Sequence, residues 1–450
     1  MQSPATRRNS ELSLLLIASI LASGALVPVA IARRPNSFDL GDPAPYMVGL
    51  SVAYLVAHVF LRKLTAFADS LILPLAALLN GLGLAGIYRL EGTRTDIPEG
   101  IAGTQIMWAV LGLGLFIATL VLVRDYKTLA SYKYVLGFVG VGLLLLPMTP
   151  LGKTVNGARL WIGFGSFQFQ PGELAKICLV IFFAAYLADR KELLAIASRK
   201  IGNLHIPDFK HFGPLLVMWG LSLSVMFFEK DLGSSLLFFS IFLVMIYIAT
   251  ARFVYMSIGL ALFGVGAYLG YTSFSHVQLR VTTWLNALDS RYVTDESYQL
   301  AQSLFAFATG GLFGTGFSQG RPDLIPAAHT DFIFSVIGEE LGLLGTSAIV
   351  LAFMLLIARG LRIAFNARDD FGQLLAAGLT AILGLQTIII LGGVTRLLPL
   401  TGITLPFMSY GGSSMLANFV LLALLVRISH QTVAEPAPAE TSEILIGGRG

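Results

Sequence analysis

The sequence predicts an all-α polytopic membrane protein with about twelve transmembrane helices. Of its 450 residues, 55% are hydrophobic and only 12% are charged, whereas about 25% of residues are charged in soluble domains. The apolar residues gather into runs of about 20, long enough to cross roughly 30 Å of hydrocarbon. Lys and Arg are concentrated in alternate connections between these runs. A water-soluble enzyme is therefore nearly excluded.

The elements follow from a pass along the chain with a window of about 19 residues. The first run follows Arg7-Arg8; because it is long and lacks a clear small-residue cleavage site, we expect an uncleaved helix. The seventh and eighth runs touch at Glu229-Lys230-Asp231 and require a tight turn there. The twelve runs are 12–31, 46–61, 69–90, 103–123, 133–150, 170–188, 213–228, 231–250, 253–270, 332–358, 371–394 and 405–428.

The charge pattern predicts the orientation of the chain. An even number of spans puts both termini on one side, and with that side inside the cell the inner segments carry most of the Lys and Arg. This bias places both termini in the cytoplasm. Residues 429–450, rich in Pro, Ala, Glu, Thr and Ser, are expected to form a disordered cytoplasmic tail.

A connection of about 60 residues, 272–331, precedes the tenth helix on the outer side. Such a length usually indicates function or disorder. The apolar and aromatic stretch 298–307 favours a helix lying against the bundle. The glycine-rich stretch 310–316 lacks the GK[ST] ending of a P-loop, so we favour a hinge or close helix packing over phosphate binding.

Polar residues within or beside the apolar runs gather at the predicted outer side. Glu173 and Lys176 are three residues apart, on one helical face, where they can form an ion pair. A structural pair and a substrate-binding pair both fit this position, because an intramembrane charge needs a partner. Asp231 begins a helix, where a role as N-terminal cap and membership of a site are compatible.

Asp331 precedes the tenth run, at its outer mouth. Partial desolvation there could raise its pKa toward that of a general base, while an N-terminal cap fits the position equally well. His329 alone is weak evidence, since the six histidines are scattered without metal-ligand spacing. We therefore predict no metal site built from protein ligands alone. The single cysteine, Cys178, excludes an intrachain disulfide.

Several segments occur in an order that resembles the SEDS family (shape, elongation, division and sporulation), which includes RodA, FtsW and SpoVE. The similarity extends over about 69–428 and is greatest to RodA proteins of the actinobacterial type. The matching segments are Asn156-Gly-Ala with Trp161-Ile, Phe169-Gln-Pro-Gly-Glu173-Leu-Ala-Lys176, Asp231-Leu-Gly233, Tyr298-Gln-Leu-Ala-Gln-Ser303, His329-Thr-Asp331-Phe-Ile-Phe with Gly338-Glu-Glu-Leu-Gly342, and Leu398-Pro-Leu-Thr-Gly402 with Pro406-Phe-Met-Ser409-Tyr-Gly-Gly-Ser413.

This resemblance implies three regions and an activity. The family core is usually drawn with ten spans, so residues 1–68 would add two helices to a polymerase domain at 69–428, followed by the tail 429–450. The implied reaction joins lipid II units into glycan strands outside the cytoplasmic membrane, for cell elongation and shape, and releases undecaprenyl pyrophosphate. The resemblance gives Asp331 the role of general base in a single inverting displacement.

Partners and further site residues also follow from the resemblance. It implies a class B penicillin-binding protein as partner, and a divalent cation, Mg²⁺ or Mn²⁺, as a possible aid. Membrane lipids surround the protein, and no basic stripe with interleaved aromatics indicates nucleic acid. Outer cations could neutralise the pyrophosphate. The substrate-binding candidates are Lys153, Arg159, Glu173, Lys176, Lys230, Asp231, His329, Arg396 and Ser409.

Some positions depart from the family pattern and keep an alternative open. Arg159 stands one residue further from Trp161 than usual, and Gly172 replaces a serine before Glu173. The alternative is a lipid II flippase or another secondary transporter, suggested by twelve spans and by buried Glu173 and Lys176. It is disfavoured because the polar residues cluster outside rather than tracing a path through the midplane.

Overall fold

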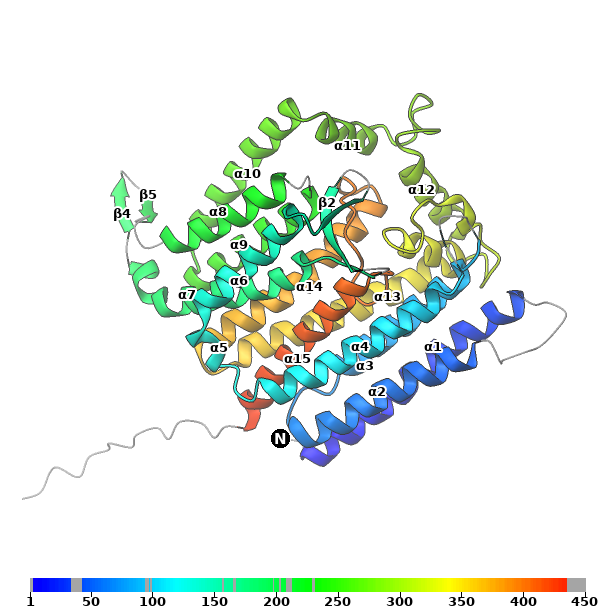
Figure 1. Ribbon diagram of the computed structural model, residues 1–450, viewed down its shortest axis with the longest axis horizontal. Coiled ribbons are helices and arrows are strands. Elements are labelled where there is room, and N and C mark those ends of the chain that lie inside the picture. The colour runs from blue at the N-terminus through cyan, green and yellow to red at the C-terminus, as the bar shows by residue number, and fades with distance from the viewer. Residues whose placement is uncertain are drawn as a thin grey trace, which may run out of the picture.

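The computed structural model describes residues 3–33, 43–93, 97, 99–155, 158–164, 167–196, 198–201, 204–207, 213–228 and 231–434. Long helices dominate it (Figure 1), and each of the twelve expected apolar runs contains one. These helices are α1 (Pro4–Arg33), α2 (Ala44–Leu64), α3 (Ile72–Leu90), α4 (Ile101–Leu122), α6 (Lys133–Leu145), α7 (Gly172–Ile196), α8 (Gly213–Phe228), α9 (Leu232–Thr250), α10 (Phe253–Ser273), α13 (Ile333–Asn366), α14 (Asp370–Val394) and α15 (Gly412–Ala434).

The expected multi-pass membrane architecture is confirmed. Within the described ranges, nine helices are long and apolar enough to cross a membrane, and two shorter apolar helices lie at Lys133–Met148 and Gly213–Val225. Short helical pieces, α5 (Thr128–Ser131) and η1 (Leu146–Met148), flank α6. The last apolar run departs from expectation at its start, because 405–411 is a largely buried non-helical loop and α15 begins only at Gly412.

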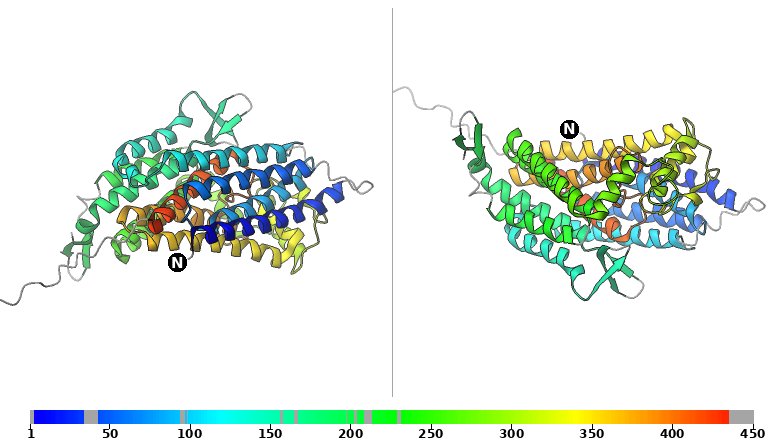
Figure 2. Two further views of the ribbon diagram at one scale, coloured as in Figure 1. Left: turned by 90° about the horizontal axis from the view of Figure 1, so that it is seen from below. Right: turned by 90° about the horizontal axis from the view of Figure 1, so that it is seen from above.

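The helices pack side by side into an elongated bundle (Figures 1 and 2). The most extensive pairings are α4 with α15, α6 with α7, α1 with α3, and α13 with α14. Glycines let helices approach closely, as is usual in membranes. A Cβ atom on Gly112 of α4 would lie 2.3 Å from the Phe419 ring of α15, and one on Gly83 of α3 would lie 2.4 Å from the Met408 carbonyl oxygen.

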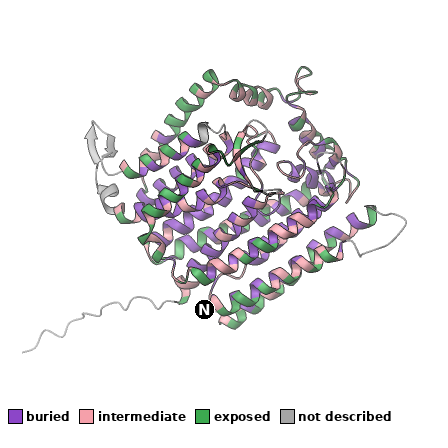
Figure 3. Ribbon diagram, in the orientation of Figure 1, coloured by how far each residue is buried: buried purple, intermediate pink, exposed green. Residues whose placement is uncertain are grey.

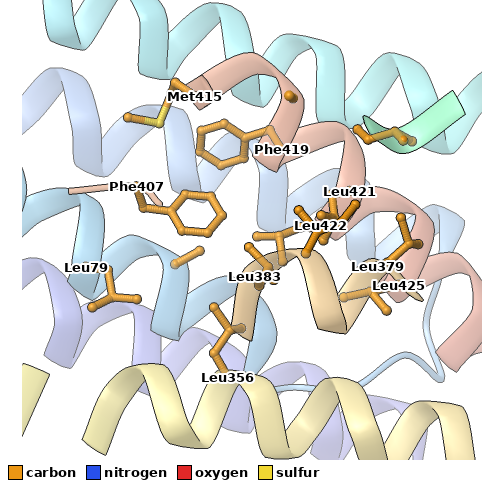
Figure 4. Packing of buried hydrophobic residues seen from close by; sticks show 14 of the residues in the cluster. Leu79, Leu356, Leu379, Leu383, Phe407, Met415, Phe419, Leu421, Leu422 and Leu425 are labelled. Atoms are coloured by element: carbon orange, nitrogen blue, oxygen red, sulfur yellow. The ribbon is translucent and has the colours of Figure 1, made fainter. Parts of the chain in front are cut away.

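The centre of the bundle is formed mainly by α14 and α15, with α3 and α13 against them (Figure 4). Leu379 and Leu383 of α14 and Leu422 and Leu425 of α15 are at most 2% exposed. Figure 3 shows this buried interior and, in contrast, the largely exposed α10. Exposed apolar side chains on α10, such as Leu262, are what a lipid-facing helix requires.

Two small sheets add to the all-α expectation. Strands β1 (Gly152–Val155), β2 (Ala158–Phe164) and β3 (Phe167–Phe169) form an antiparallel sheet with the order β1-β2-β3, in which Lys153 pairs with Trp161. It projects from the side of the bundle (Figure 2). Strands β4 (Ser198–Ile201) and β5 (Leu204–Pro207) form a separate hairpin. Strands this short lie outside what hydropathy along the chain detects.

The long connection before α13 contains three helical segments joined by turns and loops. The expected helix is confirmed as α12 (Tyr298–Gly310). The connection also contains the helix α11 (Ser275–Leu285) and the short helix η3 (Pro322–Leu324). Close packing explains the glycines after α12. Gly314 has a φ of +82°, and a Cβ atom there would lie 2.1 Å from the Glu340 carbonyl oxygen. The backbone N–H of Gly316 donates to that oxygen at 3.0 Å. The stretch 310–316 thus packs on α13, which kinks at Gly342.

The described ends of the chain meet at one end of the bundle (Figure 1). The expected start of the disordered tail at 429 is wrong, because α15 continues to Ala434. Contacts explain the extra turn: the backbone N–H of Asp69 donates to Ser429 Oγ at 3.0 Å, and that of Phe67 donates to His430 Nδ1 at 3.2 Å. Residues 435–450 lie outside the described part of the chain.

Candidate active site

Asp331 lies in a tight turn immediately before α13. The backbone N–H of Thr330 donates to the Ala327 carbonyl at 3.1 Å, and α13 follows Phe332 with no side-chain cap. The structure therefore does not support the capping role for Asp331. The carboxylate instead approaches Gly402, where a Cβ atom would lie 3.7 Å from Asp331 Oδ2. Gly402 has a φ of +76°, a conformation that glycine adopts without strain.

The loop between α14 and α15, residues 395–411, holds this turn in place. Ser409 Oγ donates to the Thr330 carbonyl at 2.5 Å and accepts from the Leu405 N–H at 2.9 Å. The N–H of Tyr410 donates to the His329 carbonyl at 2.8 Å. Ser409 and Tyr410 therefore hold the two residues that immediately precede Asp331. These contacts position the turn, and the substrate-binding role of Ser409 stays a prediction.

Arg280, from α11, contacts the loop that carries Gly402. Its Nη1 donates to the carbonyl oxygens of Leu400 at 3.0 Å and Thr401 at 3.2 Å. Its charge interacts with both Asp231 and Asp331. The sequence offers no local signal for this role, because it arises only when α11 folds back over the loop that contains Gly402. Arg280 is the site residue that sequence reasoning missed.

Burial is the main cause of the pKa shifts of all three charged groups. Burial raises the pKa of Asp331 to about 6, and a hydrogen bond with Thr330 and the charge of Arg280 act against this rise. Burial likewise raises the pKa of Asp231. Burial lowers the pKa of Arg280, which the two aspartates oppose. A carboxyl group with a pKa near 6 can accept a proton at neutral pH, as a general base must.

Asp231 caps α9 close to the loop that carries Gly402. Its side chain accepts from the Ser234 N–H at 2.9 Å, which confirms the expected cap. Two residues later, a Cβ atom on Gly233 would lie 2.8 Å from the Thr401 carbonyl oxygen. The glycine thus lets α9 pack against the loop that carries Gly402. The cap is confirmed, and membership of the site stays a prediction that this packing allows.

Glu173 and Lys176 form the expected ion pair inside the bundle. Their charged atoms are 2.9 Å apart, and both residues are buried. Lys176 Nζ also donates to Gln386 Oε1 at 3.2 Å, and Gln386 Nε2 donates to the Thr404 carbonyl at 2.8 Å. The charges of this pair reach Asp231. A polar network therefore runs from α7 through α14 to the loop beside Asp331.

Two expected outer cations lie on the small sheet. Lys153 on β1 and Arg159 on β2 are exposed. Arg159 Nη2 donates to the Thr149 carbonyl at 2.8 Å. A Cβ atom on Gly163 would lie 2.4 Å from Lys153 Nζ, so this lysine extends across β2. Across the described ranges, no recorded hydrogen bond or ion pair joins either cation to Asp331.

Arg396 has a structural task that the sequence did not predict. Its Nε donates to the Trp284 carbonyl at 2.8 Å and its Nη2 to the Leu285 carbonyl at 2.5 Å, while Trp284 Nε1 donates to the Arg396 carbonyl at 3.1 Å. Arg396 thus anchors the end of α11, the helix that carries Arg280. Lys230 lies outside the described residues.

A metal centre made of protein ligands alone does not fit this arrangement. Over the part of the chain that the structure describes, no group of three or more His, Cys, Asp or Glu could hold a metal ion. The charge of Arg280 interacts with both site aspartates. A divalent cation therefore stays a prediction, and no step below depends on one.

Comparison with known proteins decides the family. The model of a cell cycle protein family, named for FtsW, RodA and SpoVE, matches residues 69–434. The chain belongs to this family. "Peptidoglycan glycosyltransferase RodA" of Mycobacterium tuberculosis is 45% identical over 433 residues, 94% of this chain and 91% of the relative. The Mycobacterium leprae protein of the same name is 44% identical over 98% of this chain and 95% of its own length.

A more distant relative and two solved structures agree with this family. Stage V sporulation protein E of Bacillus subtilis is 32% identical over 80% of this chain and 96% of its own length. A structure described as "Structural coordination of polymerization and crosslinking by a peptidoglycan synthase complex" has a TM-score of 0.64 at 24% identity, covering 82% of this chain and 99% of the other.

The RodA structure of Thermus thermophilus has a TM-score of 0.54 at 24% identity and covers 81% of this chain and 98% of its own. These structural likenesses show the fold. The names of the curated relatives confirm the expected enzyme class, peptidoglycan glycosyltransferase. The resemblance to the SEDS family and to RodA is likewise confirmed.

Proposed function

We propose that the chain polymerises lipid II into the glycan strands of peptidoglycan, with Asp331 as the general base. The observation that carries this proposal is a partly buried carboxylate with a pKa of about 6, held beside Arg280. The names of the mycobacterial relatives support the reaction class. The positive-inside pattern supports an active site on the extracytoplasmic side.

The chemistry requires one base and one good leaving group. Asp331 takes the proton from a sugar hydroxyl of the acceptor while that oxygen attacks the anomeric carbon of the donor. The new glycosidic C–O bond forms as the bond from the anomeric carbon to the pyrophosphate breaks. The products are a glycan one unit longer, undecaprenyl pyrophosphate and protonated Asp331. A single displacement inverts the anomeric centre without a covalent enzyme intermediate.

The leaving pyrophosphate is an anion, so a nearby cation would stabilise it as it forms. Arg280 is the cation whose charge reaches Asp331. Its two recorded hydrogen bonds use Nη1 alone, which leaves further guanidinium N–H groups for a phosphate oxygen. Lys153 and Arg159 on the exposed sheet suit an earlier encounter with the substrate headgroup. Arg396 would act indirectly, by holding α11.

A class B penicillin-binding protein is the proposed partner, in elongation and cell shape. The solved structure most relevant to this point is described as a complex that coordinates polymerization and crosslinking. That description applies to a protein of the same fold. We propose a corresponding pairing here, in which the partner links the peptides of the strands that this chain polymerises.

The alternative, a lipid II flippase, rests on the buried Glu173 and Lys176. Their charges are paired at 2.9 Å and also bound through Gln386 to the loop beside Asp331. This arrangement favours a fixed structural network over a path for substrate through the midplane.

Two assays of the wild-type protein, one for polymerisation and one for exchange of lipid II between leaflets, distinguish the two functions. Purified protein with its penicillin-binding partner and lipid II should give glycan chains, seen on a gel. Proteoliposomes that hold fluorescent lipid II should show no more exchange between leaflets than protein-free liposomes. Rapid exchange without polymer would support the flippase and contradict the polymerase.

A further inference from the structure

A cavity of about 360 Å³ opens at the end of the bundle opposite Asp331. α13 begins beside Asp331 and runs for 34 residues to Asn366, which lines this cavity. α15 also begins on the site side and reaches the cavity at Ser429 and Thr432. At about 1.5 Å per residue, α13 separates the two places by roughly 50 Å. The charge pattern assigns this end to the cytoplasm.

Three arginines and one carboxylate line the cavity. Arg7 comes from α1, Arg359 and Arg362 come from α13, and Asp69 precedes α3. Arg359 Nε donates to Asp69 Oδ2 at 2.8 Å, so the charges of these two side chains neutralise each other. Asp69 Oδ1 also accepts from the Leu71 N–H at 2.9 Å, which fixes the carboxylate in place.

The other two arginines keep their positive charges. Arg7 Nη1 donates to the Phe67 carbonyl, an uncharged acceptor, at 2.7 Å. Arg362 is exposed and has no recorded ion pair or hydrogen bond anywhere in the described chain. The cavity also contains the hydroxyl groups of Ser70, Ser429 and Thr432. Two uncompensated guanidinium groups with neighbouring hydroxyls suit a phosphate ester, which accepts charge-assisted hydrogen bonds.

The position of the cavity indicates where the phosphate comes from. It lies where membrane-spanning helices end, at the depth of lipid headgroups. Leu361 and Phe365, which flank Arg362 on α13, are 39% and 80% exposed. Exposed apolar side chains at this place suit acyl chains, whereas a soluble phosphate compound would leave them in contact with water. Basic pockets between helices on the cytoplasmic side are suited to anionic lipid headgroups.

We propose that this cavity binds the phosphodiester headgroup of an anionic phospholipid of the inner leaflet. Arg362 and Arg7 would contact the phosphate, and the hydroxyl groups would contact the rest of the headgroup. Arg7 stands before the family match of 69–434, whereas Arg359 and Arg362 stand within it. The lipid would thus bridge the N-terminal helices and the family core. This inference does not depend on the proposed polymerase reaction.

The test measures lipid binding to the purified full-length protein in detergent. Fluorescent phosphatidylglycerol is titrated against wild type and the variants Arg362→Gln and Arg7→Gln. Phosphatidylcholine with the same acyl chains reports general lipid binding, and glycerol 1-phosphate reports binding of a free phosphate ester. The matched control is Arg62→Gln, an exposed arginine in the last turn of α2 that does not line the cavity.

We expect wild type to bind phosphatidylglycerol at least tenfold more tightly than phosphatidylcholine. Arg362→Gln should weaken phosphatidylglycerol binding at least fivefold, while Arg62→Gln changes it less than twofold. Each variant must elute like the wild type in size-exclusion chromatography. If Arg362→Gln does not fold, Arg7→Gln provides the second variant. Equal loss in the control, no preference for phosphatidylglycerol, or equally tight binding of glycerol 1-phosphate would overturn the proposal.

Discussion

At the scale of single residues, the site depends on charged groups whose pKa values are shifted by burial. Asp331 is ionised at neutral pH, yet its pKa of about 6 makes it a better proton acceptor than an ordinary aspartate. Arg280 opposes part of that shift, and in the proposed reaction the same cation also stabilises the leaving group. These two roles lead to separate predictions.

The first prediction concerns the pH dependence of polymerisation. Asp331 must be deprotonated to act as base, so the rate should be level above about pH 7 and should fall tenfold per unit well below pH 6. Initial rates with lipid II and the partner, measured from pH 5 to 8, check this. A rate that stays constant down to pH 5 would contradict the assignment.

The second prediction concerns Arg280→Gln. Removing the cation should raise the pKa of Asp331, because its charge now lowers that pKa. The acid limb of the rate profile should therefore move to higher pH, and the maximal rate should fall at least tenfold. Arg291→Gln is the control, since Arg291 is an exposed arginine of the same connection that pairs with Asp289 at 2.8 Å. A lower maximal rate without a shift of the acid limb of the rate profile would show that Arg280 has only a structural role.

At the scale of elements, the loop 395–411 and helix α11 form the site by packing together. The sequence predicted the helices well, because each apolar run is about as long as a membrane is thick. It also predicted the Glu173 and Lys176 pair from their spacing. It could not predict Arg280 or the true task of Arg396, because those contacts join α11 to a loop over 100 positions away. Hydropathy and local spacing carry no information about such contacts.

Helix packing gives a third prediction, with its control on the same helix. Gly112→Ala places a methyl group 2.3 Å from the buried Phe419 ring, whereas Gly114 has nothing within 4 Å of its Cβ position. Overpacking costs about 1–3 kcal/mol, so Gly112→Ala should lower the Tm in detergent. Gly114→Ala should leave it equal or higher, since alanine favours helix. Equal effects of both changes would contradict the packing of α4 on α15.

At the scale of the whole molecule, the bundle has two chemically different ends. The aspartates and Arg280 lie at one end, while both described chain ends and the arginine-lined cavity lie at the other. α13 and α15 connect these ends, and the N-terminal helices lie beside the family core (Figure 1). The alignment with the Mycobacterium leprae relative covers 98% of this chain, so it includes these N-terminal helices.

The fourth prediction is the orientation of the molecule in the cell. Cys178, half-buried on α7, is first replaced by alanine to give a cysteine-free protein. Asp323→Cys, in the connection before α13, should then react with a charged maleimide added outside intact cells. Lys63→Cys, at the other end, should react only after the membrane is opened. The reverse pattern would place the active site in the cytoplasm and exclude the proposed reaction.

The central claim is tested most directly by lipid II polymerisation with Asp331→Asn. The amide keeps the size of the side chain but cannot accept the proton, so the rate should fall at least a hundredfold. The matched change is Asp289→Asn, on a half-buried aspartate of the same connection that pairs with Arg291 and whose pKa is about 2, and it should keep most of the activity. Glycan chains formed by a folded Asp331→Asn protein at the wild-type rate would contradict Asp331 as the base.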